Sequence, residues 1–429
     1  MTMTDRTKQP EIKEIDDIKL PSPKKDTLSN GIRTYCFENP NLDLIYLLLQ
    51  FRTGTLHQTK KHVCQYAFQL LRESSQHYMP EEMEERLDFF GTNITTNIGL
   101  DKVQVMITIP KRNIGNILPD ICDFLTNPAY RENSLQLYKE RELKNLAYNE
   151  QKTDFLSWRL LWRELFGKSL PEIFKFSSPE TINAVNIGDL AAFQRTVCCA
   201  ENMTLFFTGN VDNETERIIH DNFSRIPQGE KSAAPPVIQP WTEGRTIYQE
   251  MPGCLQSSIV LCVPMAGYND PERSKFSVLS TIAGGYFGSR LMQKLRERQG
   301  FTYGVSAASA YFGSQSVFAI SSDVNAKDTA AAVDSCFEEL ELLQKEPVPQ
   351  KELATVKTYM TGLSLRSIDT SVNAMQKFAT YHHFGLDETE MERNIAEIKE
   401  VAADDIQDLA KKHFSYNKFN RIIVGENRE

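Results

Sequence analysis

The sequence predicts an α+β protein of two tandem homologous domains. Each is a ββααββ unit followed by helices and a last strand, so that a mostly antiparallel sheet is covered by helices. The first observation behind this prediction is that the order of strand-like and helical segments in residues 29–225 returns in residues 247–429. The second is the stretch 226–246, which is rich in proline and glycine, lacks periodicity and is typical of a linker.

The third observation is that the two halves end alike. Asp189 lies 20 residues before Gly209, and Asp405 lies 20 residues before Gly425. Both pairs are therefore offset by the same 216 residues (405 − 189 and 425 − 209). A constant offset of this kind is typical of a duplicated domain, and the mixture of strands and helices in each copy gives the α+β class.

Each element follows from its local pattern. Residues 1–28 are polar and contain several prolines, which predicts an extended N-terminal arm. Beyond the arm, β-branched or alternating runs predict strands, and amphipathic runs predict helices. The strands expected in the first half are 31–37, 43–53, 92–97, 101–109 and 203–208, and the helices are 60–73, 80–90, a series from 112 to 197, and 213–224. The strands expected in the second half are 246–251, 256–264, 301–311, 315–322 and 420–424, and the helices are 272–283, 288–299 and a series from 326 to 412.

Composition narrows the class of partner. The 429 residues are 41% hydrophobic and 24% charged, with a net charge of −9 and a pI of about 5.5. An acidic chain without a basic stripe argues against nucleic acid or anionic lipid as its main partner. No apolar run approaches the eighteen residues that span a bilayer, and the first residues lack the apolar centre of a secretory signal. Eight cysteines without a C-x-x-C spacing are expected to be reduced, which favours a cytoplasmic protein.

The stretch 284–305, GGYFGSRLMQKLRERQGFTYGV, combines a helix, a glycine stop and the start of a strand. Its leucines and methionine form an apolar helical stripe, and Gly300 follows where a positive φ closes a helix. This places Arg296 in the last helical turn and Tyr303 at the beginning of the strand. Taken alone, the helix dipole and ordinary β-propensity account for these two residues.

In its setting, this stretch resembles the signature of the pitrilysin/insulinase zinc peptidases, the M16 family. Relatives of that family include the mitochondrial processing peptidase and the core subunits of the respiratory bc1 complex. The resemblance covers nearly the whole chain after residue 28. The first half supports it through Ser75 and the segment MPEEMEERLDFFG at 79–91. The resemblance implies a LuxS/MPP-like metallohydrolase fold in both halves.

The family's first half carries H-x-x-E-H on a helix, with a further glutamate roughly 75–80 residues on. Residues i and i+4 share one helix face, so two imidazoles can bind one Zn²⁺, and the glutamate at i+3 polarises the metal-bound water. Counted back from Ser75, these positions fall on QYAFQ at 65–69. Both histidines are then glutamines, Gln65 and Gln69, and the catalytic glutamate is Phe68.

The distal ligand is expected in the helix YKERELKNLA at 138–147, where its match is Ala147. A shift of three residues rescues one ligand, His62, and leaves Gln65 and Tyr66 in place of the glutamate and the second histidine. Because amides are poor zinc ligands and phenylalanine is no base, the zinc site is expected to be absent from this chain. The chain itself is expected to bind neither a metal nor a cofactor, and zinc is expected in a partner subunit.

Other candidate sites are weak. The adjacent histidines His382 and His383 point about 100° apart on a helix, so they are not expected to share an ion. His57 and His62 lack nearby carboxylates, and Cys64 has no base partner, so all three are expected to be structural. The glycines at 284–288 lack the spacing of a dinucleotide fingerprint.

In the family, an arginine and a tyrosine seven positions apart hold the substrate carbonyl and stabilise the oxyanion, and Arg296 and Tyr303 match that pair. Some bacterial members divide the work between two chains, one with the zinc motif and one with only this pair. The leading hypothesis is therefore a non-zinc subunit. It supplies Arg296 and Tyr303 to a zinc-bearing M16 subunit that acts on unstructured peptides.

Two alternatives remain open. In the first, the chain is a non-catalytic structural or peptide-binding homologue, in which Arg296 and Tyr303 are packing residues and peptides bind by strand addition. In the second, it is an independent enzyme with an unrecognised site. A homodimer is also left open, and it would lack zinc at both sites.

Overall fold

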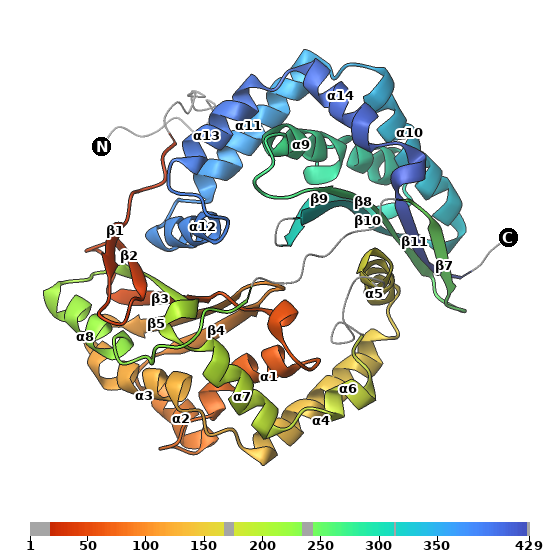
Figure 1. The fold of residues 1–429 in the computed structure, drawn as a ribbon. Coiled ribbons are helices and arrows are strands. Elements are labelled where there is room, and N and C mark those ends of the chain that lie inside the picture. The colour runs from red at the N-terminus through yellow and green to blue at the C-terminus, as the bar shows by residue number, and fades with distance from the viewer. Residues whose placement is uncertain (1–17, 167–175, 234–242, 313–314, 427–429) are drawn as a thin grey trace, which may run out of the picture.

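Two β-sheets face each other across the molecule, each backed by its own helices (Figure 1). The structure, a computed structural model, describes residues 18–166, 176–233, 243–312 and 315–426. The first part of the predicted arm and the middle of the predicted linker lie outside these residues. Along the described residues, none of the helices combines the length and the apolarity that crossing a bilayer takes.

The two sheets have the same topology. The first sheet has the order β1-β2-β6-β3-β5-β4, and the second has the order β7-β11-β8-β10-β9. Removing β1 leaves orders that correspond strand for strand, including one parallel pair in each, β2 with β6 and β7 with β11. The bounds are β1 Lys24–Thr27, β2 Arg33–Glu38, β3 Leu44–Phe51, β4 Asn93–Ile98, β5 Val103–Pro110, β6 Met203–Gly209, β7 Thr246–Glu250, β8 Gln256–Ala266, β9 Thr302–Phe312, β10 Gln315–Asn325 and β11 Asn420–Gly425.

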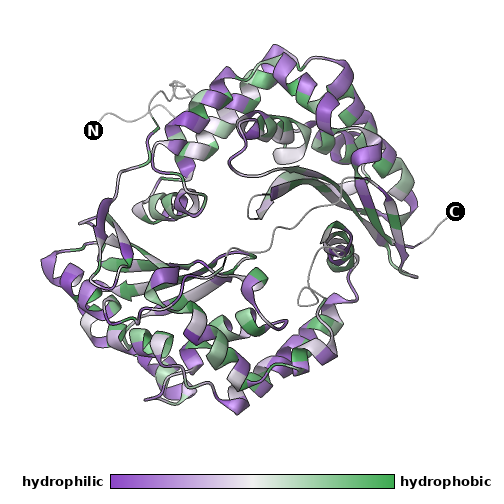
Figure 2. Cartoon of the chain, viewed as in Figure 1, coloured by the Kyte–Doolittle hydropathy of each residue, from purple (hydrophilic) through white to green (hydrophobic). Residues whose placement is uncertain are grey.

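Helices cover the outer face of each sheet, and hydrophilic and hydrophobic residues alternate along them (Figure 2). The helices of the first half are α1 Val63–Gln69, α2 Pro80–Phe89, α3 Ile114–Thr126, α4 Glu132–Asn149, α5 Thr153–Phe166, α6 Pro179–Asn183, α7 Ile187–Val197 and α8 Asn213–Phe223. Those of the second half are α9 Arg273–Ser280, α10 Thr329–Lys345, α11 Gln350–Arg366, α12 Ser371–His383, α13 Glu390–Glu400 and α14 Ala403–His413. The predicted α+β class and duplicated order are thus confirmed.

An ion pair is duplicated with the fold. Lys60 Nζ lies 2.6 Å from Asp189 Oδ2, and Lys275 Nζ lies 2.7 Å from Asp405 Oδ1. Each aspartate also accepts a bond from the backbone at the start of its own helix, α7 or α14. The residues that revealed the repeat in the sequence therefore occupy equivalent places in the two copies.

One helix from each half packs against the sheet of the other half. Helix α5, from the first half, lies on the inner face of the second sheet, where Leu161 and its neighbours meet β8, β10 and β11. Helix α12, from the second half, lies on the inner face of the first sheet, where Phe378 packs against Phe206 and Tyr35. The sequence divided the chain near residue 226, but each half buries part of its sheet under a helix of the other.

Two local features differ from the sequence expectation. The end of the arm forms a strand, β1, which pairs antiparallel with β2. The helix predicted at 288–299 contains a π-helix, η7 Met292–Arg298, and a second π-helix, η6 Thr281–Gly285, precedes it. The predicted stop at Gly300 is confirmed, because its φ is +67°.

Candidate functional site

The face of α1 that turns toward α4 gathers several polar side chains. Gln65 Nε2 lies 3.3 Å from Glu142 Oε2 and 3.5 Å from the hydroxyl of Tyr138. The next residue on α1, Tyr66, packs edge-on against Tyr138 with ring centroids 4.9 Å apart. Helix α4 therefore lies beside α1 in the place where the family's distal ligand is expected.

His62 completes this cluster from the position just before α1. It adopts a left-handed backbone with φ +73°, and its ring stacks on Tyr66 with centroids 5.3 Å apart. Its Nε2 lies 3.3 Å from Thr181 Oγ1, whereas the buried Nδ1 has no partner among the described residues. Burial and the charge of Lys61 lower the pKa of His62 to about 4, against a smaller opposing effect of the neighbouring Gln65 side chain.

The other predicted motif positions lie elsewhere. Phe68 is buried against Phe51, with ring centroids 5.3 Å apart. Gln69 is exposed at the end of α1. Ala147 is exposed on α4, where its carbonyl accepts a bond from Gln151. Of the three positions assigned by counting back from Ser75 and the distal match Ala147, the structure brings only Gln65 to Glu142.

The structure instead groups the residues of the three-residue shift, His62, Gln65 and Tyr66, with Glu142. Sequence reasoning missed Glu142. A usable signal was its spacing, because Glu142 lies 76 residues after Tyr66 (142 − 66), within the 75–80 expected for the distal ligand.

This cluster does not fit a zinc ion. It offers one imidazole and one carboxylate, and across the described residues no group of three or more His, Cys, Asp or Glu is arranged to hold a metal. Burial and the charge of Glu142 raise the pKa of the Tyr66 hydroxyl far above its usual range, so it is no phenolate ligand. Gln65 is a neutral amide and takes no proton from water. No hydrolytic step through a metal follows from these residues.

Arg296 and Tyr303 lie on either side of the Gly300 turn. The Arg296 guanidinium sits over the ring of Phe287 at 4.8 Å, and its Nε lies 3.5 Å from Glu297 Oε1. The Tyr303 side chain is 90% exposed and Phe287 is 61% exposed. The exposed phenol of Tyr303 is available to another molecule.

The remaining histidine and cysteine candidates pack against, or hydrogen-bond with, other parts of the fold. His382 packs against Tyr35 and Phe206, whereas His383 Nε2 lies 3.1 Å from Asp101 Oδ2 and so joins the two halves. His57 Nδ1 accepts a bond from the N–H of Gly54, and its Nε2 lies 3.1 Å from the carbonyl oxygen of Ala233 in the predicted linker. Cys64 is buried, which raises the pKa of its thiol to about 12.

Among the residues that the structure describes, no strand pairs with the outer side of β4, which forms an edge of the first sheet. The N–H of Gly99 donates to the carbonyl of Lys102 at 2.8 Å in the turn that joins β4 to β5. Bonded and non-bonded pairs alternate along an antiparallel ladder, so Asn97 and Gln104 form the next bonded pair. The residues between the bonded pairs turn their N–H and C=O groups toward the free edge; these are Ile94, Thr96 and Ile98.

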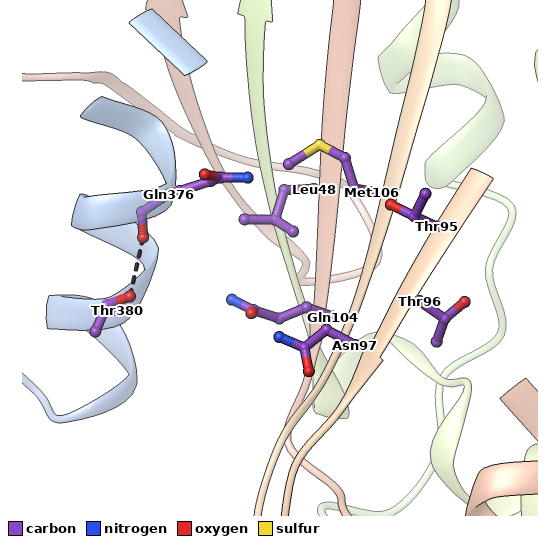
Figure 3. A pocket seen from close by; sticks show the side chains of 8 residues that line it. All are labelled: Leu48, Thr95, Thr96, Asn97, Gln104, Met106, Gln376 and Thr380. Atoms are coloured by element: carbon purple, nitrogen blue, oxygen red, sulfur yellow. Dashed lines mark hydrogen bonds between the residues drawn. The ribbon is translucent and has the colours of Figure 1, made fainter. Parts of the chain in front are cut away.

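A pocket of about 470 Å³ opens beside this edge, between the inner face of the first sheet and α12 (Figure 3). Its lining comes from both halves of the chain and contains no charged residue: Leu48, Thr95, Thr96, Asn97, Gln104, Met106, Gln376 and Thr380. A bare strand edge and a polar pocket thus adjoin each other on one face.

Comparison with known sequences supports the resemblance. Residues 184–360 match the family model described as the Peptidase M16 inactive domain. An uncharacterized zinc protease of Rickettsia bellii is 23% identical over 416 residues, which cover 93% of this chain and 97% of that protein. The non-peptidase homolog YmxG of Helicobacter pylori is 20% identical over 410 residues, which cover 91% of each chain.

Solved structures agree in fold. The peptidase M16 inactive domain from Pseudomonas fluorescens superposes with a TM-score of 0.85 at 19% identity, covering 95% of this chain and 98% of that one. A protease from Helicobacter pylori gives a TM-score of 0.84 at 15% identity, covering 95% and 100%. A chain of complex III2 from Candida albicans gives 0.74 at 16% identity, covering 94% and 96%.

Proposed function

We propose that this chain, which belongs to the M16 peptidase family, is a non-catalytic homologue that binds extended peptides by adding them as a strand to β4. The observation that carries the proposal is the free edge of β4 beside an uncharged pocket. The place where a zinc peptidase holds its base has a neutral amide, Gln65, so the chain is proposed to hold peptides without cutting them.

The two edge strands of the first sheet differ in charge. Its other edge, β1, has the sequence KKDT with all four residues exposed, and charges of this kind discourage pairing with a foreign strand. Strand β4 has the sequence NITTNI, without any charge or proline. Strand addition needs backbone groups that are free to pair, and β4 keeps these groups at Ile94, Thr96 and Ile98.

The experiment measures the anisotropy of a labelled unstructured peptide titrated with the purified chain. Thr96→Pro removes one outward N–H without removing a bond to β5, and Thr96→Val keeps that N–H with a side chain of similar shape. Peptide binding at least about fivefold weaker in Thr96→Pro than in Thr96→Val is expected, because one backbone bond is lost and the ring obstructs pairing. Equal binding by the two variants would refute strand addition at β4.

A second function is favoured by the exposure of Tyr303 and the stacking of Arg296 on Phe287. In that function the chain pairs with a zinc-bearing M16 subunit and supplies both side chains to its substrate. The two functions are compatible, because peptide capture at β4 and donation of Arg296 and Tyr303 use different halves. Neither nucleic acid nor a membrane takes part in either.

A reducing compartment suits both functions. All eight cysteines are unpaired, and seven of them are buried. Free thiols in these numbers fit a cytoplasmic protein.

A further inference from the structure

We propose that the pocket between the first sheet and α12 is a subsite for an uncharged carboxamide side chain, a glutamine or asparagine, of the peptide added to β4. This inference rests on the proposed function and names the class of side chain that it selects. The pocket volume of about 470 Å³ is larger than a single side chain needs, so a bridging water also fits.

The pocket lies on the face to which side chains of a strand added at β4 would point. Asn97 pairs with Gln104, and Thr95 pairs with Met106, so these side chains form neighbouring rows on the inner face. A strand added beside β4 would lie about 4.8 Å away, and every second side chain would point to the same face. A long side chain from that strand reaches across Thr95 toward the floor formed by Leu48 and Met106 (Figure 3).

Hydrogen bonds between side-chain amides fix the orientation of Gln104 in the pocket. Gln104 Nε2 donates to Gln50 Oε1 at 2.8 Å, and Gln50 Nε2 donates to the carbonyl of Ala379 on α12 at 3.4 Å. Gln50 is buried, so this chain of amides sets which way Gln104 faces. The Gln104 carbonyl oxygen remains as an acceptor.

Several donors and acceptors of the pocket lining remain free to bind an occupant. Thr380 donates its hydroxyl proton to the backbone carbonyl of Gln376 at 3.0 Å, so its oxygen is left as an acceptor (Figure 3). The side-chain amides of Asn97 and Gln376 have no partner among the described residues, and each offers both donors and an acceptor. An occupant that both donates and accepts satisfies this set, and a carboxamide does so.

The pocket disfavours charged and aliphatic side chains. A carboxylate or an ammonium would lose water here without meeting an opposite charge, and an aliphatic side chain would displace water from amides that it cannot pair. Each unmade bond or unpaired charge is expected to weaken binding by about tenfold to a hundredfold. The pocket therefore selects for amide chemistry as well as for size.

The test uses peptides of about twelve residues with a uniform serine–threonine–alanine host and one variable position. Such a host can slide along β4, so a single preferred residue finds the pocket. Binding is measured by anisotropy for glutamine, glutamate, lysine and leucine at that position. The glutamine peptide is expected to bind at least about tenfold more tightly than the other three.

Two variants of an exposed position on α12 sharpen the test. Gln376→Lys places a positive charge at the pocket and is expected to reverse the preference from glutamine to glutamate. Gln376→Met is expected to weaken the glutamine preference without favouring glutamate.

The outcomes separate the two proposals. If all four peptides bind equally and remain sensitive to Thr96→Pro, the subsite is refuted and strand addition stands. If none of the peptides binds, both are refuted. If Gln376→Lys leaves the preference unchanged, glutamine is selected elsewhere and the assignment of this pocket fails.

Discussion

The side-chain nitrogen of Gln65 on α1 lies 3.3 Å from the carboxylate oxygen Oε2 of Glu142 on α4. In a zinc site, facing carboxylates are held together by the charge of the metal. Here the amide donates a hydrogen bond to Glu142 and takes over that role without a cation. Gln65 stands where the catalytic glutamate would be in this register, and its bond gives the Glu142 carboxylate a partner without a metal.

The first prediction is that two substitutions in the register of this cluster create a zinc site. Gln65→Glu together with Tyr66→His restores the H-x-x-E-H pattern that begins at His62, with Glu142 as the third ligand. The double variant is expected to bind one zinc ion per chain, as measured by elemental analysis, since two imidazoles and a carboxylate then converge. Zinc is also expected to raise its thermal stability, because the metal relieves the repulsion between Glu142 and the carboxylate introduced at position 65.

The matched control uses the register counted back from Ser75. Gln65→His with Phe68→Glu and Gln69→His places charge in the core at Phe68, and Gln69 is exposed at the end of α1. This triple variant is expected to take up no zinc. Zinc in the triple variant and none in the double variant would reverse the assignment.

The fold could be predicted because its causes are local. Strand and helix periodicities, together with the equal spacing from Asp189 and Asp405 to their glycines, are properties of the sequence itself. The exchange of α5 and α12 was not predictable in this way. The apolar stripe around Leu161 fits either sheet equally well, and only the three-dimensional arrangement decides which one it covers.

The site was predicted less well, for a physical reason. The expectation that Gln65, Phe68 and Gln69 hold no zinc follows from residue types alone. The register does not, because a glutamine or phenylalanine at a former ligand position carries no geometric signature. The left-handed backbone of His62 delays the start of α1 to Val63, and the contact between Gln65 and Glu142 then fixes the alignment of α1 with α4. Tyr138 and Thr181 join the cluster only through folding.

The second prediction concerns the seam between the halves. Leu161 on α5 is fully buried against the second sheet, whereas Leu137 on α4 is 68% exposed. Leu161→Ala is expected to lower the free energy of unfolding by about 2–5 kcal/mol, and Leu137→Ala by less than about 0.5 kcal/mol. Both are measured by urea titration.

The same titration tests whether the halves unfold together. Trp158 and Trp162 lie on α5, so their fluorescence reports on the seam, while circular dichroism reports on all helices. Coincident transitions are expected, because each half buries a helix of the other. Two separate transitions in the parent chain would show that the exchanged helices do not couple the halves.

The third prediction concerns acid. The usual pKa of histidine is 6.5, and burial lowers that of His62 to about 4. Between these values the unfolded chain takes up a proton that the folded ring refuses, so the contribution of His62 to stability falls as the pH drops from about 6.5 to 4 and is constant below that range. His62 contributes roughly 3 kcal/mol to this loss.

His62→Phe keeps a ring to stack on Tyr66 and removes both the titration and the unpartnered Nδ1. The variant is expected to show a shallower fall in stability over this pH range than the parent, measured by urea unfolding at several pH values. His382, whose pKa burial also lowers to about 4, is expected to supply a further part of the slope. An unchanged slope in His62→Phe would mean that the ring is protonated in the fold.

The fourth prediction concerns Tyr303. Because its side chain is 90% exposed, Tyr303→Phe is expected to change the melting temperature by less than about 1 °C. In a mixed complex with a zinc-bearing M16 subunit, the same change is expected to lower kcat by about tenfold to a hundredfold, with little effect on KM. The reason is that a phenol that donates to a developing oxyanion acts only in the transition state.

Phe287→Ala, which leaves the guanidinium of Arg296 without its stacking partner, is expected to give a smaller loss of kcat. Tyr248→Phe is a matched control, because that tyrosine is 40% exposed and its hydroxyl donates to the Gly425 carbonyl. A mixed complex that cleaves peptides at the same rate with and without the Tyr303 hydroxyl would exclude donation by this residue and leave peptide capture at β4 as the function of the chain.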